Sequence, residues 1–216
     1  MYDQRPNMII GFHGCDESKA NQLVNDPDTI SFSKENYDWL GHGLYFWENN
    51  YDRALEWAKQ KEAQGKIKKA AVVGAILQLG QCCDFLDTKF IRTISVYHKL
   101  MESQYQQAGK KLPENLNAPV DPHNDRLLRM LDCATIEFMH KEITQKYKED
   151  ILKTGYSNIK VFDSTRGVFT EGGLAYTGAG IYAKSHIQIC IRNFNCIKGF
   201  FIPRKEIEFP TPSKTT

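Results

Sequence analysis

Short apolar runs of strand length alternate with helical periodicity along the first eighty residues. Residues 8–12 and 44–47 are short apolar runs that predict strands, and residues 70–79 form the continuous, valine-bearing run typical of a strand buried on both faces. Between them the apolar positions recur at helical spacing, which predicts one helix capped by Ser18 and a second capped by Asn49 or Asn50.

The period is helical again in two later segments. The apolar positions of these segments are Phe90, Ile94, Tyr97 and Met101, then Leu127, Leu131, Ala134 and Phe138. Between them, residues 109–124 are rich in Pro, Asn and charge and predict an exposed loop. Strands are expected again at residues 159–162, 187–191 and 196–202. The pattern predicts an α+β fold whose mixed sheet has flanking helices and a helical insertion at about residues 87–150.

Composition narrows the class of protein. The 216 residues are 41% hydrophobic and 25% charged, which fits one globular domain over about residues 1–205 and a flexible tail at 206–216. The net charge of +2 does not by itself indicate nucleic-acid binding. No apolar run has the length of a membrane span, and no secretion signal is evident. The six cysteines form no C-x-x-C pair, so we expect reduced thiols, a cytoplasmic location and no metal.

The first chemical motif is Gly11-Phe12-His13-Gly14-Cys15, at the end of the first apolar run. A histidine at this position could donate a hydrogen bond to a ribose hydroxyl, and Gly14 would let a ligand approach the backbone. A histidine that only caps a turn is the alternative interpretation.

The second motif runs from Leu40 to Trp47, where a loop with Gly41 and Gly43 enters an aromatic strand. The face of Tyr45 could stack on the positively charged pyridinium ring of NAD. For Phe46 and Trp47, a place in the hydrophobic core is the better interpretation.

Together the two motifs resemble the ADP-ribosyltransferase superfamily in its histidine-tyrosine-glutamate branch, which includes poly(ADP-ribose) polymerases and diphtheria toxin. Phe12-His13-Gly14 is similar to the H-G-[ST] motif of that family, and residues 41–46 to its G-x-G-[IL]-Y-F motif. The resemblance implies a split mixed sheet, with NAD as substrate held by His13, Gly14, Cys15, Gly43 and Tyr45. Cys15 stands where the family has Ser or Thr, which puts one hydrogen bond to the carboxamide in doubt.

The family also has a catalytic glutamate, and here the chain departs from the pattern. The matching position is Gln188, which is uncharged. Glu171, at the start of a glycine-rich loop, is a charged candidate for the same role, although a solvated loop glutamate is an equal alternative. Arg166 could contact the pyrophosphate of NAD, but a plain salt bridge is the more ordinary use of this residue.

These residues predict an NAD-dependent mono-ADP-ribosyltransferase that modifies a macromolecular acceptor, either protein or nucleic acid. The chain also resembles bacterial toxin and phage-defence proteins, which would imply an antitoxin protein as a partner. Two alternatives stay open: an NAD- or nucleotide-binding module of the same fold without turnover, and an RNA 2′-phosphotransferase-like enzyme.

Overall fold

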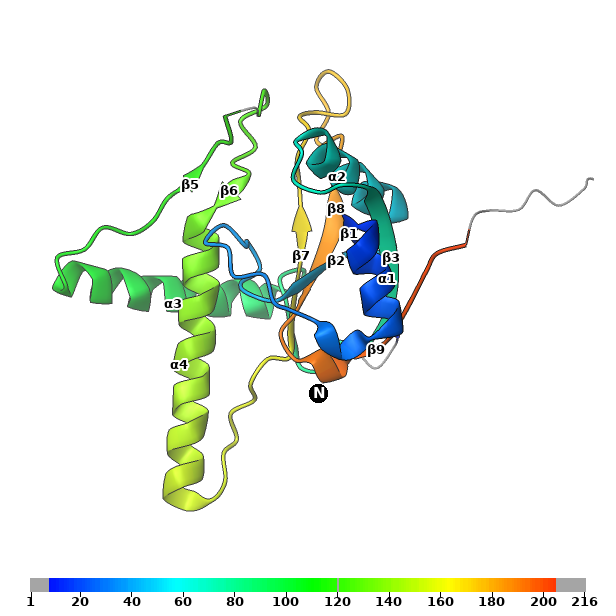
Figure 1. Cartoon of the computed structure of the whole chain (residues 1–216). Coiled ribbons are helices and arrows are strands. Elements are labelled where there is room, and N and C mark those ends of the chain that lie inside the picture. The colour runs from blue at the N-terminus through cyan, green and yellow to red at the C-terminus, as the bar shows by residue number, and fades with distance from the viewer. Residues whose placement is uncertain (1–7, 120, 205–216) are drawn as a thin grey trace, which may run out of the picture.

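The computed structural model describes residues 8–119 and 121–204; the predicted tail at 206–216 lies outside the described residues. It confirms an α+β architecture with a large mixed sheet and four α-helices in the described part of the chain (Figure 1). The sheet has the order β4-β7-β8-β2-β1-β3-β9. Its strands are β1 (Ile9–Asp16), β2 (Leu44–Glu48), β3 (Ala70–Leu77), β4 (Cys82–Asp84), β7 (Ser164–Phe169), β8 (His186–Ile191) and β9 (Ile197–Phe201).

The pairing between β1 and β2 is short. β1 pairs with β3 along its whole length, but with β2 only at Gly11↔Glu48 and Phe12↔Trp47. Beyond Phe12 the ladder stops, and the first residues of β2 pair with β8 alone. The sheet is therefore split on the side where β1 ends and β2 begins, next to both chemical motifs.

Helices α1 (Glu17–Asn25) and α2 (Tyr51–Ala63) cover opposite faces of this sheet. Leu23 of α1 packs with Val73, whereas Ala54 of α2 packs with Val72, and neighbouring strand residues point to opposite faces. Asn50 caps α2, one of the two residues predicted for this role. The prediction of Ser18 as the cap of α1 is wrong, because the Asp16 carboxylate accepts the hydrogen bond from the Ser18 amide.

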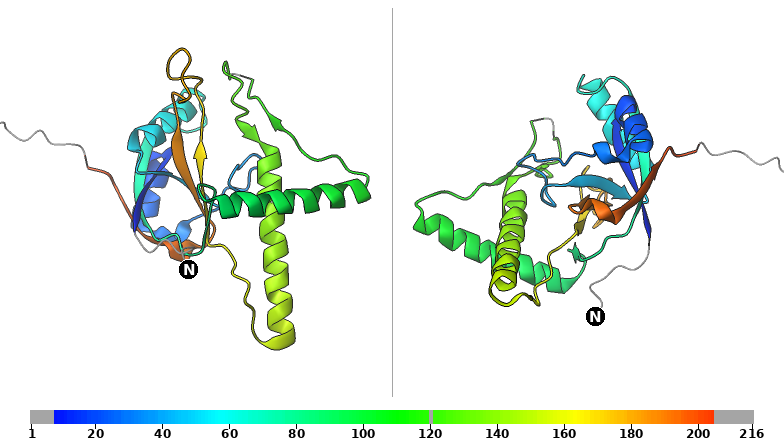
Figure 2. Two further views of the ribbon diagram at one scale, coloured as in Figure 1. Left: turned by 180° about the vertical axis from the view of Figure 1, so that it is seen from behind. Right: turned by 60° about the horizontal axis from the view of Figure 1, so that its bottom comes forward.

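The two later helices form an arm beside the sheet. Helices α3 (Thr88–Gln107) and α4 (Met130–Thr154) cross one another, and the far end of α4 extends away from the sheet (Figure 2). The segment between them contains a small ladder of β5 (Asn115–Leu116) with β6 (Leu128–Arg129). We call α3, β5, β6, α4 and the loops that join them the helical arm.

Two details of the predicted strands are wrong. Residues 159–162 form no strand, because Ile159, Val161 and Phe162 pack against the cluster of Phe90 and Met139 on the helical arm. The chain joins the sheet only afterwards, at β7. The short strand β4, which follows β3 and pairs in parallel with β7, was not predicted. No helix in the described ranges is both long enough and apolar enough to cross a membrane.

Candidate functional site

A cleft of about 1100 Å³ opens where β1 and β2 separate. Its lining comes from the sheet, from α1 and α2, from the loop before β2, from residues 118–119 and 121–128 of the helical arm and from the two ends of the loop after β7. The predicted site residues on this lining are His13, Gly14, Gly43, Tyr45, Glu171 and Gln188. The fold thus brings together residues from four separate parts of the chain.

His13 bridges the split in the sheet. Its ring nitrogen Nδ1 lies 2.8 Å from the carbonyl oxygen of Tyr45. Since a carbonyl only accepts hydrogen bonds, Nδ1 is the donor, and in the neutral ring Nε2 is then an acceptor. Burial lowers the pKa of His13, with a smaller opposite effect from this hydrogen bond, which favours the neutral ring. The sequence predicted that His13 donates a hydrogen bond to a ribose hydroxyl. Because Nδ1 already donates to Tyr45, Nε2 is an acceptor, and a ligand hydroxyl would donate to it.

Tyr45 fastens the loop that precedes its own strand. Its hydroxyl donates to the carbonyl oxygen of Gly41 at 2.8 Å and accepts from the amide of Leu40 at 2.9 Å. Burial raises the pKa of Tyr45 well above its ordinary value, so the hydroxyl stays protonated and can keep donating. With the hydroxyl engaged in the loop, the ring is the part of Tyr45 that is left for a ligand.

Close packing of neighbouring backbone explains why Gly14 and Gly43 are glycines, and the sequence did not reveal this. A Cβ atom on Gly14 would lie 2.1 Å from the carbonyl oxygen of Ala54 on α2. A Cβ atom on Gly43 would lie 2.5 Å from the carbonyl oxygen of Ile191 on β8. Glycine is therefore required at both positions by the close approach of neighbouring backbone, whatever the ligand.

Gln188 is held by an aromatic residue that sequence reasoning missed. Its side-chain oxygen accepts a hydrogen bond of 2.6 Å from the indole nitrogen of Trp39. Gln188 lies in β8 between Trp47 of β2 and Gly167 of β7. With the oxygen occupied by Trp39, the amide NH₂ is the group that Gln188 can offer to a ligand.

Glu171 is paired with Arg53, a second residue that sequence reasoning missed. The guanidinium of Arg53 donates to Glu171 Oε1 through Nε at 3.1 Å and also through one terminal nitrogen. Both side chains are largely buried, at 9% and 13% exposure, and both line the cleft. Arg53 lies on α2, where no sequence pattern links it to the loop after β7.

The loop that begins at Glu171 has two further attachments. The Asp125 carboxylate of the helical arm accepts a hydrogen bond of 2.6 Å from the Gly172 amide. On the other side, Lys184 forms an ion pair of 2.8 Å with Glu56 of α2. These contacts hold the loop between α2 and the helical arm, with the Glu171 carboxylate at the cleft.

Two predicted site residues lie away from the cleft lining. Arg166 is a residue of β7, and its guanidinium pairs with Glu48 at 2.5 Å and with Asp84 at 3.0 Å. Its predicted contact with pyrophosphate is therefore not supported by the geometry, which agrees with the alternative of a plain salt bridge. The Cys15 side chain packs with Leu23 and Val73, and burial raises its pKa to about 11. Cys15 thus acts as a small core residue, and a hydrogen bond from its side chain to a carboxamide is not supported either.

Comparison of the chain with models of known protein families, with curated proteins and with solved structures finds no match. Function is therefore inferred from the residues of the cleft. Within residues 8–119 and 121–204, no group of three or more His, Cys, Asp or Glu side chains is arranged to hold a metal ion.

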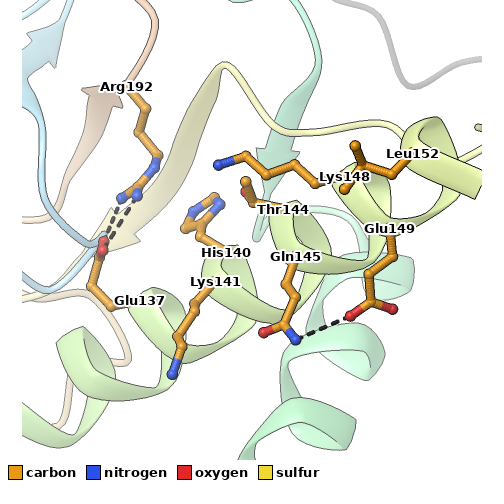
Figure 3. Close-up of a pocket in the computed structure, with 9 residues that line it drawn as sticks. All are labelled: Glu137, His140, Lys141, Thr144, Gln145, Lys148, Glu149, Leu152 and Arg192. Atoms are coloured by element: carbon orange, nitrogen blue, oxygen red, sulfur yellow. Dashed lines mark hydrogen bonds and ion pairs between the residues drawn. The ribbon is translucent and has the colours of Figure 1, made fainter.

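A second depression, of about 480 Å³, lies along α4 and is bordered at one end by Arg192 (Figure 3). At one end of it Glu137 forms an ion pair with Arg192, and Glu137 Oε1 also accepts a hydrogen bond of 2.8 Å from the amide of His42. Arg192 donates to the His42 carbonyl oxygen at 2.9 Å. These contacts join α4 to the loop of residues 41–43, which Tyr45 fastens from the other side. The Glu137–Arg192 pair therefore helps to hold the loop of residues 41–43 in place at the cleft.

Proposed function

We propose that the chain is an NAD-dependent mono-ADP-ribosyltransferase that transfers ADP-ribose from NAD to a macromolecular acceptor. The observation that supports this most is the meeting of His13, Tyr45, Glu171 and Gln188 on one cleft at the split in the sheet. These residues come from β1, β2, the loop after β7 and β8. Each is of a chemical type that binding or cleavage of NAD requires.

In this reaction the bond between the nicotinamide nitrogen and C1′ of the ribose breaks. The electron pair leaves with nicotinamide, and positive charge develops on the ribose. A nucleophile on the acceptor then bonds to C1′ and loses a proton. Tyr45 stacks on the nicotinamide ring, the Nε2 atom of His13 accepts a hydrogen bond from a ribose hydroxyl, and the amide of Gln188 donates one.

The developing positive charge is the step that most needs the protein. A carboxylate stabilises such a charge far more than a neutral amide does, so Glu171 suits the electrostatic role better than Gln188. Arg53 partly neutralises the charge of Glu171. Both hydrogen bonds from Arg53, however, use the same carboxylate oxygen, Oε1. The other carboxylate oxygen is left to face the ribose.

The test is release of nicotinamide from NAD, with and without cell lysate, together with transfer of label from NAD to the lysate. Treatment of the labelled product with protease or nuclease then identifies the acceptor class. We expect His13→Ala and Tyr45→Ala to abolish both signals while circular dichroism shows folded protein. His98→Ala on α3, outside the cleft lining, is the matched control for the histidine and should retain activity. Full activity in both cleft variants would reject the assignment of the site.

The second candidate is a module that binds NAD or a related nucleotide without turnover. The observation in its favour is that the residue on β8 is a neutral glutamine while the cleft acid is already paired with arginine. Nucleotide binding without nicotinamide release from any lysate would favour this candidate. An RNA 2′-phosphotransferase-like activity has less support, because neither Arg166 nor Arg192 lines the cleft. A role as a toxin or phage-defence effector rests on sequence resemblance alone.

A further inference from the structure

The charges along the cleft differ in how they are neutralised. Among its acids, Asp38 accepts a hydrogen bond from the Ser33 hydroxyl, Asp125 from the Gly172 amide, and Glu171 is paired with Arg53. Four lysines also line the cleft. Lys184 is paired with Glu56, and the other three are Lys19, Lys61 and Lys66. In the described part of the chain, none of the three forms an ion pair with a carboxylate.

These lysines, which we call the lysine rim, stand beside the predicted nicotinamide pocket. Lys19 lies on α1, where it donates to the Thr29 carbonyl oxygen at 3.3 Å, and its charge contributes to the lowered pKa of His13. Lys61 lies in the last turn of α2, with its ammonium 4.9 Å from the ring centre of Trp57. The lysine rim therefore borders the cleft from both helices that flank the split.

Lys61 and Lys66 are near enough to repel one another. Burial is the main cause of the lowered pKa of Lys61, and the charge of Lys66 is the second. The carboxyl end of α2 favours one nearby cation, but a second cation close to the first costs stability unless an anion joins them. A bound phosphate would remove this repulsion.

We propose that the lysine rim binds the phosphate groups of a nucleotide whose sugar lies at His13. The assignment to a nucleotide rests on the proposed function, in which NAD is the ligand. It gives the lysines the role that the sequence suggested for Arg166, which the structure engages in ion pairs with Glu48 and Asp84. Lysine ammonium groups are common binders of phosphate as point charges.

The test is titration of the whole chain with ADP, which carries the phosphates without nicotinamide. The double variant Lys61→Gln/Lys66→Gln removes two charges of the lysine rim. Lys59→Gln/Lys68→Gln removes two exposed charges from the same region, outside the cleft lining. We expect the first variant to bind ADP about tenfold or more weakly, since it loses two charge-assisted contacts with the phosphates. The loss should shrink at high salt, and the control should bind as the wild type does.

A second arm identifies the source of the phosphate by titrating the same proteins with a single-stranded oligonucleotide. Loss of oligonucleotide binding with unchanged ADP binding would overturn the nucleotide assignment and give the phosphate site to a nucleic-acid acceptor. Equal affinity of wild type and rim variant for both probes would overturn the proposal altogether. Rim-dependent ADP binding in a protein that releases no nicotinamide would support the lysine rim and reject the proposed function. Nicotinamide release with an unchanged KM for NAD in the rim variant would reject the rim alone.

Discussion

The sheet region and the helical arm pack in different ways. In the sheet, Phe46, Leu77 and Ile189 have no exposed surface. They belong to one hydrophobic cluster, which is formed by strands on both sides of the split. On α3 of the arm, Val96 and Leu100 are 57% and 50% exposed. The arm therefore depends on a small cluster around Phe90 and Met139, where its helices meet the sheet.

The sheet and the helical arm contribute different parts of the cleft. The sheet supplies a rigid frame with His13, Tyr45 and Gln188 on strands. The helical arm supplies few core contacts but holds two loops, one through Glu137 at the His42 amide and the other through Asp125 at the Gly172 amide. What looked like a separate helical insertion in the sequence closes one side of the cleft.

Truncating one apolar residue in each region tests this comparison most strongly. Phe46→Ala in the sheet should lower the free energy of unfolding by about 3–5 kcal/mol, because a fully buried aromatic side chain leaves a cavity. Val96→Ala on the exposed side of α3 should change it by less than about 0.5 kcal/mol. Urea denaturation measures both values. Similar losses at the two sites would show that the arm is packed as tightly as the sheet.

Neutralising Glu171 tests whether the loop after β7 or the strands of the sheet contribute most to stabilising the charge on the ribose. Glu171→Gln should reduce nicotinamide release about a hundredfold or more, as is typical for loss of one electrostatic partner in the transition state. Glu56→Gln, which removes the other carboxylate paired with Arg53, is the matched control and should have a much smaller effect. Gln188→Ala should also cost less than Glu171→Gln. The reverse order would assign the main role to Gln188.

Removing the charge of Glu137 tests the support that α4 gives to the cleft. Glu137→Gln keeps the shape of the side chain but weakens its contacts with Arg192 and the His42 amide. We expect a loss of about 1–3 kcal/mol in stability, because a partly buried arginine loses its charged partner. Activity should fall as the loop fastened by Tyr45 loosens. Unchanged thermal unfolding and activity would show that the arm is not needed by the cleft.

The pH dependence of stability tests the boundary of the two regions, where His140 of α4 faces the sheet. Burial, and next the charge of Arg192, lower the pKa of His140 on α4 to about 3 from an ordinary value near 6.5. Above pH 6.5 both folded and unfolded chains hold a neutral His140. Between pH 6.5 and 3 only the unfolded chain binds this proton, so the free energy of unfolding falls as the pH falls.

His140→Gln should remove this dependence. The slope of stability against pH should decrease by up to about 1.4 kcal/mol per pH unit between pH 6 and 4, the value for one proton. Denaturant titrations at several pH values measure the slope. An identical slope in wild type and variant would mean that His140 is protonated in the folded protein as well.

Features that depend on near neighbours could be predicted from the sequence. Apolar runs predicted the strands β1, β2, β3, β8 and β9, and helical spacing predicted all four helices, because both patterns involve residues a few positions apart. The motifs around His13 and Tyr45 were found in the same way, and the structure places both on the cleft.

The pairing of charged residues could not be predicted, because it depends on the tertiary fold. The Arg53–Glu171 and Arg166–Glu48 pairs each join residues 118 positions apart, so strand order and helix placement determine them rather than any local pattern. The same holds for Gly14, whose missing side chain makes room for the Ala54 carbonyl, and for residues 159–162, whose apolar side chains pack on helices instead of pairing in the sheet. The sequence indicates that an apolar or charged side chain needs a partner, but the tertiary fold determines which partner lies within contact distance.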